Sequence, residues 1–200
     1  MPCANIGHFR YRSPEESGLL AELACDELAD ITRLTETIDM LAKRIGERVR
    51  SAAPSLLGLS GCGELTAAKI VAETAGVDRF KSEGAFARHI GLAPLPHWSG
   101  DRSVRFRRTK SGNRQLNMAL HRIAVTQIRM HGLGQAYYRG RIADGDTRAN
   151  ALRALKRRLA RVVYCRLGTD QHNRRQSSPA GPRRRGSGSG HRSPRRNCWR

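Results

Sequence analysis

The stretch LLGLSGCGELTAAKIVAE, residues 56–73, decides the fold of this chain. Its glycines Gly61 and Gly63 permit a tight turn, and the small Ala67 lets two short helices pack closely. The pattern predicts a helix-hairpin-helix, although a plain turn between two helices is compatible with the same glycines. In such a hairpin the first N–H groups of the second helix point outward and suit a phosphate bound without regard to base sequence. We therefore expect nucleic acid to be bound at Gly61, Gly63, Thr66 and Lys69.

Before the hairpin, the sequence predicts one long helix that opens at Ser13-Pro14 and ends before Pro54. Between Ile31 and Ile45 the apolar residues recur at alternating steps of three and four, which is the seam of a coiled coil. A helix that packs on its own domain buries the same stripe. The pattern therefore leaves open whether this helix packs within the chain or joins a homodimer or tetramer.

Ser82 is predicted to cap a short helix that Gly91 ends, and Ser111-Gly112-Asn113 is predicted to turn into the next helix. A short basic strand is predicted between Gly91 and Asn113. Val104 and Phe106 alternate there with arginines, as in a strand with one apolar and one basic face. A basic strand face suits phosphate, so the expected phosphate contacts are Arg102, Arg105, Arg107, Arg108, Lys110 and, at the start of the next helix, Arg114. The serine of Ser99-Gly100 stands just before this strand, and the residues alone favour an ordinary turn there.

Two C-terminal helices and a tail complete the predicted fold. The first helix ends at Gly132 and Gly134, and the second begins near Thr147 with an apolar stripe backed by a cationic one. Beyond Leu167 the content of Arg, Ser, Pro and Gly predicts a disordered basic tail. The fold class is mainly α, with a long coiled-coil-like N-terminal helix, the hairpin, a short basic β segment and these two helices. The expected domains are a connector helix at 1–51, a C-terminal domain at 52–168 and the tail at 169–200.

The charge of the chain indicates nucleic acid as its partner. Lys and Arg outnumber Asp and Glu by 37 to 17, a formal net charge of +20, and such a chain repels itself unless a polyanion neutralises it. No apolar run reaches the roughly 20 residues that span a bilayer, so no membrane is expected and the protein is predicted to be cytoplasmic and nucleoid-associated. The five cysteines form no CxxC pair and have no histidine at finger spacing, so no metal site is predicted.

The chain carries an ordered set of short motifs. They are Leu59-Ser60-Gly61-Cys62-Gly63, Thr66-Ala67-Ala68, Phe80-Lys81-Ser82, Gly91-Leu92-Ala93-Pro94, Ser99-Gly100, Lys110-Ser111-Gly112-Asn113-Arg114 and Tyr137-Tyr138-Arg139. In this order they resemble one family, the insertion-sequence transposases of the IS116/IS110/IS902 type. The resemblance covers about residues 52–167 and corresponds to the C-terminal domain of those proteins, and the helix before it is similar to their coiled-coil connector.

The resemblance implies a role for Ser99 that the residues alone do not. In that family the corresponding serine is the proposed nucleophile for DNA strand cleavage and exchange, directed by a structured RNA from the element itself. A RuvC-like domain supplies acidic residues for divalent metal. We find no counterpart of that domain here, so we expect a truncated chain without a cofactor of its own, with magnesium bound only by the absent nuclease domain. The Asp144-Gly145-Asp146 pair is interpreted as a solvated turn.

Two functions follow as hypotheses. The first is a transposase module that recombines DNA through Ser99 when another chain provides the metal-bearing domain, and that is inactive alone. Its arginines would stabilise the negative charge that develops at phosphorus, and His97 is near enough in sequence to accept the proton. The alternative is a non-catalytic, nucleic-acid-binding remnant of a mobile element. A third possibility, a basic structural RNA-binding protein, is supported only by the charge.

Overall fold

The computed structural model describes residues 14–97, 105–108 and 111–177, and for residues 14–17, 95–97 and 105–108 it describes the backbone alone. The described chain is mainly helical, which confirms the predicted class. It divides into two compact units, Met1–Arg44 and Ile45–Arg200.

Helix α1, Pro14–Ala52, is continuous over 39 residues and confirms the predicted long helix. Up to Leu41 its large apolar side chains are between 44% and 63% exposed. The polar residues around them pair locally, as in the ion pair of Arg33 with Asp30 at 3.0 Å. This part of α1 therefore keeps the predicted apolar seam open to solvent.

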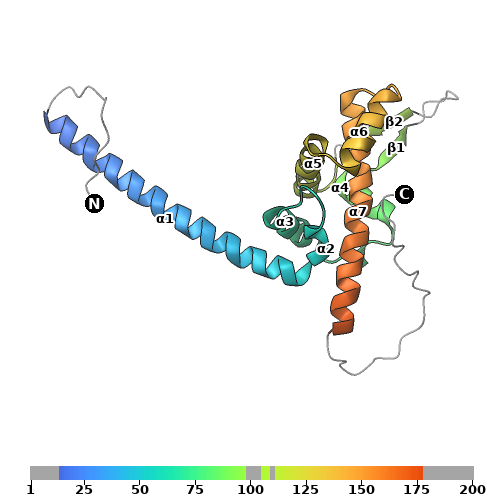
Figure 1. The fold of residues 1–200 in the computed structure, drawn as a ribbon, viewed down its shortest axis with the longest axis horizontal. Helices are drawn as coiled ribbons and strands as arrows, with labels where there is room; N and C mark the ends of the chain where they lie inside the picture. Colours follow the sequence, from blue (N-terminus) through green and yellow to red (C-terminus); the bar gives the residue numbers. More distant parts are fainter. Residues whose placement is uncertain (1–13, 98–104, 109–110, 178–200) are drawn as a thin grey trace. The chain divides into compact units, whose positions relative to one another are not determined.

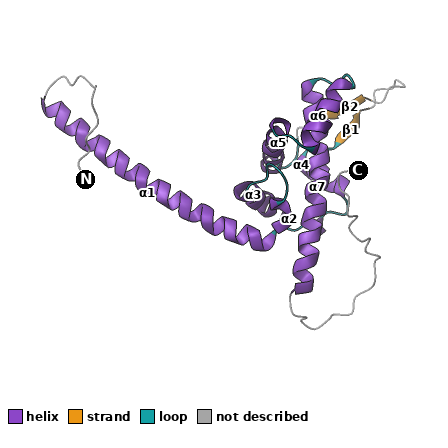
Figure 2. Cartoon of the chain, viewed as in Figure 1, coloured by secondary structure: helices purple, strands orange, loops and turns teal. Residues whose placement is uncertain are grey.

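The second unit is built from short helices around one long one (Figure 1). Helix α7, Arg148–Ser177, contacts α2, α4, α5 and α6. Figure 2 shows how little of this unit is strand. The other elements are α2 (Pro54–Leu57), α3 (Glu64–Thr74), the 3-10 helix η1 (Val77–Arg79), α4 (Glu83–Ile90), β1 (Pro94–His97), β2 (Arg105–Arg108), α5 (Arg114–Arg129) and α6 (Leu133–Ala143).

The core of this unit lies along the apolar stripe of α7. Leu155, Leu159 and Val163 are at most 1% exposed. Phe86 of α4 and Leu120 of α5 are also fully buried in the same cluster. Each such side chain contributes about 1.5–3 kcal/mol when it leaves water. The apolar stripe predicted for the last helix therefore lies at the centre of the hydrophobic core.

Local signals in the sequence place several helix ends correctly. Ser82 caps α4 by accepting a hydrogen bond from the Ala85 N–H at 3.2 Å. Gly91 ends that helix in the left-handed conformation, with φ +78°. Asn113 caps α5 by accepting from the Leu116 N–H at 3.0 Å. These residues act through neighbours three or four positions away, which is why the sequence alone identifies them.

Helix α6 was not predicted, because Gly132 and Gly134 were interpreted as the end of the preceding helix. Gly134 instead lies inside α6 and is buried. A Cβ on Gly134 would stand 2.3 Å from Oε1 of Gln127, so the glycine permits close packing of α6 on α5. This correction has a tertiary cause, since the crowding residue lies on another helix.

Helix α7 also runs to Ser177, so the prediction of a disordered tail from residue 169 was wrong for residues 169–177. Asp170 is 2% exposed and accepts the Ser55 N–H at 3.2 Å. Gln171 accepts the Val77 N–H at 3.2 Å through its Oε1. The composition suggested disorder because composition contains no information on hydrogen bonds to backbone groups that are far away in the sequence. The predicted tail beyond residue 177 lies outside the described residues.

Cys62 is buried in the core of the second unit. Burial raises the pKa of the Cys62 thiol to about 11, so this thiol stays protonated. No group of three His, Cys, Asp or Glu side chains in the described part of the chain could hold a metal ion. Within that part, no helix is both long enough and apolar enough to cross a membrane.

Candidate nucleic-acid interface

Residues 58–63, which we call the hairpin turn, connect α2 to α3 and require a glycine at position 61. The turn is tight, since the Cys62 N–H donates to the Leu59 carbonyl at 2.9 Å. Gly61 has φ +84°, a region that favours glycine. A Cβ there would also stand 2.9 Å from Cβ of Thr126 on α5. Gly61 therefore has a structural role besides any contact with phosphate.

Gly63 differs from Gly61, because neither its backbone nor its surroundings require glycine. It is the N-cap of α3, with φ −74°, and a Cβ there would meet nothing within 4 Å. The first intrahelical bond of α3 joins the Ala67 N–H to the Gly63 carbonyl at 2.9 Å. The N–H groups that precede Ala67 in this helix have no intrahelical acceptor. The space next to Gly63, where a Cβ would stand, is open.

An ion pair that the sequence did not suggest stands beside this opening. Glu64, the first residue of α3, pairs with Arg50 in the last turn of α1, and both side chains are about half exposed. The glycine at position 46 provides room, because a Cβ there would collide with the Glu64 carboxylate. The pair draws the negative charge of Glu64 toward α1.

Hydrogen bonds from α7 and α5 hold α2 and the hairpin turn in position. Arg166 donates to the carbonyl of Ser55, and Asp170, one turn later on α7, accepts the N–H of the same residue at 3.2 Å. On the other side, Nε2 of Gln127 donates to the Ser60 carbonyl at 2.8 Å. These partners lie more than sixty positions apart in the sequence, so pattern reasoning could not find them.

A second pair of glycines, Gly91 and Gly112, forms what we call the glycine clasp. Both have positive φ, +78° and +124°. A Cβ on Gly91 would stand 2.6 Å from the Ser111 carbonyl oxygen, and one on Gly112 would stand 2.6 Å from the Gly91 nitrogen. The adjoining Asn113 N–H donates to the His89 carbonyl at 2.7 Å. The clasp therefore joins the two ends of the segment that carries the strands.

Within that segment β1 and β2 pair antiparallel, with Pro94 opposite Arg108 and His97 opposite Arg105. Ser99, Gly100, Arg102 and Lys110 lie outside the described residues. For Arg105, Arg107 and Arg108 only the backbone in β2 is described, so their basic face stays a prediction. The proposed proton acceptor His97 likewise contributes only its backbone.

The remaining predicted contacts lie on helices. Thr66 and Lys69 are partly exposed on α3, and Arg114 is exposed as the first residue of α5. The structure brings Gly61, Gly63, Thr66 and Lys69 together on one helix and its preceding turn.

The cationic stripe of α7 is less open than the sequence suggested. Nζ of Lys156 donates to Asn117, and burial lowers the pKa of this lysine. Arg161 pairs with Glu83 at 3.1 Å. The guanidinium of Arg158 lies 5.0 Å from the ring centre of Tyr137. Several of these cations therefore bind the protein itself, and their partners could not be read from one helix.

Comparison with known proteins points to the same family as the motifs. Residues 53–139 match the family model described as transposase of the IS116/IS110/IS902 family. The chain is 29% identical over 163 residues to the insertion element IS116 uncharacterized 44.8 kDa protein of Streptomyces clavuligerus, which covers 80% of this chain and 40% of that protein. It is 30% identical over 150 residues to the insertion element IS900 uncharacterized 42 kDa protein of Mycobacterium paratuberculosis, covering 74% and 37%.

A third relative is the insertion element IS110 uncharacterized 43.6 kDa protein of Streptomyces coelicolor, 30% identical over 114 residues, or 57% of this chain and 28% of that protein. The chain thus spans between 28% and 40% of the length of these three relatives. The family model covers the hairpin turn, the glycine clasp and both strands. Through residues 53–139, the chain is similar to the transposases of the IS116/IS110/IS902 family.

Proposed function

We propose that residues 45–177 form the DNA-binding part of an insertion-sequence transposase and hold a backbone phosphate at the start of α3. The observation that carries this proposal is the open space at Gly63, where no steric or conformational reason for glycine exists. Outward N–H groups at a helix start attract anions. The formal net charge of +20 favours a polyanion as the partner.

The test compares Gly63→Asp with Gly63→Asn. Both side chains cap helices well, so each variant is expected to be as stable as the parent chain or slightly more stable. The aspartate adds a negative charge where the phosphate would lie. We expect it to weaken DNA binding more than the asparagine does, and to reduce the slope of log affinity against log salt by about 1.

Fluorescence anisotropy with a labelled duplex over a range of salt concentrations measures both quantities. Thermal unfolding of each variant serves as the control for folding. Equal affinities of the aspartate and asparagine variants would remove the hairpin turn from the interface. An absence of DNA binding by the parent chain at low salt would contradict the proposed function as a whole.

By resemblance to the family, Ser99 is proposed as the nucleophile that attacks a DNA phosphodiester. A serine hydroxyl is weakly nucleophilic, so it needs a proton acceptor and positive charge near the phosphorus. The arginines of β2 are proposed to supply the charge. In a protein that includes the acidic metal-binding domain, Ser99→Ala should abolish strand cleavage and the control Ser103→Ala should not. Equal cleavage by both variants would exclude Ser99, and cleavage by this chain alone with magnesium would contradict its dependence on that domain.

The exposed seam of α1 is proposed to pair with a second copy of this chain. The argument is its spacing, since Ile31, Leu34, Ile38 and Leu41 occupy the alternating positions of a coiled coil and are all exposed. A Leu34→Lys, Ile38→Lys variant should be monomeric at concentrations where the parent chain is a dimer or tetramer. Sedimentation velocity distinguishes these states, and a monomeric parent chain would refute the proposal.

A structured RNA is proposed as a second ligand of the same basic unit. The support is the family resemblance together with the charge, which attracts any nucleic acid. Competition between a structured RNA and labelled DNA should reveal a shared surface. The alternative function, a nucleic-acid-binding remnant without catalysis, predicts DNA binding but no cleavage when the metal-binding domain is supplied.

A further inference from the structure

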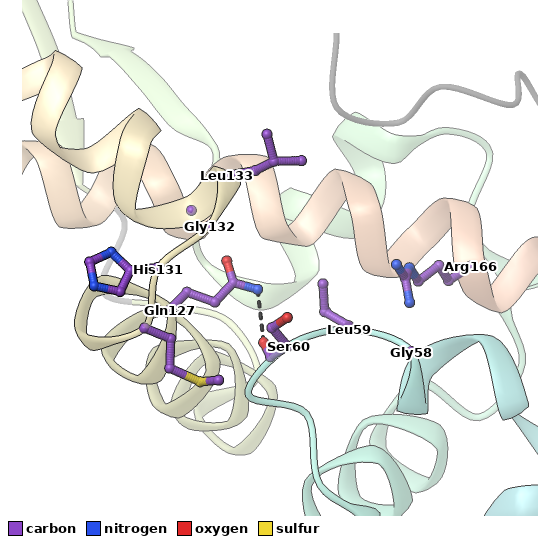
Figure 3. Close-up of a pocket in the computed structure, with 10 residues that line it drawn as sticks. Gly58, Leu59, Ser60, Gln127, His131, Gly132, Leu133 and Arg166 are labelled. Atoms are coloured by element: carbon purple, nitrogen blue, oxygen red, sulfur yellow. Dashed lines mark hydrogen bonds between the residues drawn. The ribbon is translucent and has the colours of Figure 1, made fainter.

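A pocket of about 230 Å³ opens between the hairpin turn and the start of α6. Leu59 and Ser60 of the turn form one wall, and Leu133 of α6 lies across from them (Figure 3). Arg166 lines the pocket from α7. The volume suits a small planar group rather than a large ligand.

Two large apolar side chains lie exposed at this pocket. Met130, the C-cap of α5, is 50% exposed, and Leu133, the first residue of α6, is 65% exposed. Leu59 is buried in the opposite wall. Apolar side chains of this size can hold the flat faces of a nucleobase that has left its stack. The pocket therefore has one buried apolar side chain in its wall and two exposed apolar side chains at its opening.

Gln127 gives the pocket a polar wall with an unsatisfied group. Its side chain is 5% exposed, and its Nε2 donates to the Ser60 carbonyl, as the dashed line in Figure 3 shows. Its Oε1 has no hydrogen-bond partner among the described residues. A buried acceptor without a donor is costly, and the N–H groups at the edge of a base are suitable donors.

Arg166 adds positive charge to the same pocket. Its guanidinium donates to the Ser55 carbonyl and has no carboxylate within ion-pair distance in the described part of the chain. A nucleotide whose base enters the pocket carries its phosphate only a few bonds away. The charge of Arg166 would therefore attract the nucleotide as a whole.

We propose that this pocket receives one unstacked base of the nucleic acid bound at the hairpin turn. Met130 and Leu133 contact the faces of the base, and Gln127 accepts a hydrogen bond from its edge. The inference rests on the proposed DNA-binding function and adds to it a second contact, with a base instead of a phosphate. Because the pocket and Gly63 share one turn, a strand can occupy both.

The test uses the full chain and two labelled single strands of equal length, oligo-dA and an abasic strand with the same phosphates. The parent chain is expected to bind oligo-dA about tenfold more tightly, as the loss of one stacked base predicts. The variant Met130→Ala, Leu133→Ala should lose that preference and keep its affinity for the abasic strand. The matched control is Met118→Ala, Ile142→Ala, which truncates two exposed side chains outside the pocket and should retain the preference.

The outcomes separate the two proposals. Equal binding of oligo-dA and the abasic strand by the parent chain, or an unchanged preference in the Met130→Ala, Leu133→Ala variant, would overturn the base pocket and leave the phosphate contact at Gly63 standing. Failure of the parent chain to bind either strand or duplex at low salt would overturn both. Because the truncated side chains are exposed, all variants should have the melting temperature of the parent chain.

Discussion

Helices α1 and α7 have similar sequence patterns and opposite environments. They contain 39 and 30 residues, and each carries an apolar stripe flanked by charged side chains. On α1, Leu34 and Ile38 are 51% and 63% exposed, whereas Leu155 and Leu159 on α7 are fully buried. Periodicity therefore identifies a helix and its apolar face but does not identify what covers that face.

The polar side chains of the two helices differ in the same way. On α1, Asp30 pairs with Arg33 one turn away, an interaction within the helix. On α7, Arg166 and Asp170 bond to the backbone of α2 instead. Polar residues of a central helix thus satisfy groups on other elements, and this makes them part of the fold rather than of its surface.

The largest effect on stability is expected where the two helices differ most, at their apolar stripes. Leu155→Ala should lower the free energy of unfolding by about 2–5 kcal/mol, because it leaves a cavity in the core. The matched change on α1, Leu34→Ala, should have an effect of at most about 0.5 kcal/mol on the unfolding of the second unit. Urea denaturation followed by circular dichroism measures both, and similar losses would show that the two stripes are equally buried in solution.

Substitution of a polar residue on each helix is expected to have a smaller effect on stability. Asp170→Ala should cost about 1–3 kcal/mol, since it leaves the Ser55 N–H without its acceptor. The exposed control Asp30→Ala should cost about 0.5 kcal/mol or less, because a surface ion pair contributes little. Thermal unfolding at constant salt tests the pair. A neutral Asp170→Ala variant would mean that the bond between Asp170 and Ser55 does not support the fold.

The smallest expected effect concerns two helical glycines that have open space around them. Gly168→Ala on α7 should raise the free energy of unfolding by about 0.5–1 kcal/mol, since alanine restricts the unfolded chain and no atom lies near its Cβ. Gly18→Ala on α1 meets the same conditions. It should increase the helix signal in circular dichroism without shifting the melting of the second unit. If Gly18→Ala shifted the melting of the second unit as much as Gly168→Ala does, α1 would unfold together with the core.

A feature could be predicted from the sequence when the residues that form it lie close together in the chain. Ser82, Gly91 and Asn113 act on neighbours within their own helix ends, and the sequence located all three. Gly61 was correctly interpreted as a turn glycine, whereas the steric freedom of Gly63 and the pairing of Glu64 with Arg50 became visible only in three dimensions. The roles of Ser99 and of the arginines around β2 remain predictions, because their side chains lie outside the described residues.

The amino-acid sequence alone was enough to predict the helical class, the turn at Gly61, the basic character and the resemblance of residues 53–139 to one transposase family. These properties depend on composition and on spacings of a few residues. Three other features became known only from the structure: the stripe of α7 is covered while that of α1 is open, Gly134 lies within a helix, and α7 continues to Ser177. The physical reason is that packing and hydrogen bonding between residues far apart in the chain cover or expose a helix face, and local patterns contain no record of those partners.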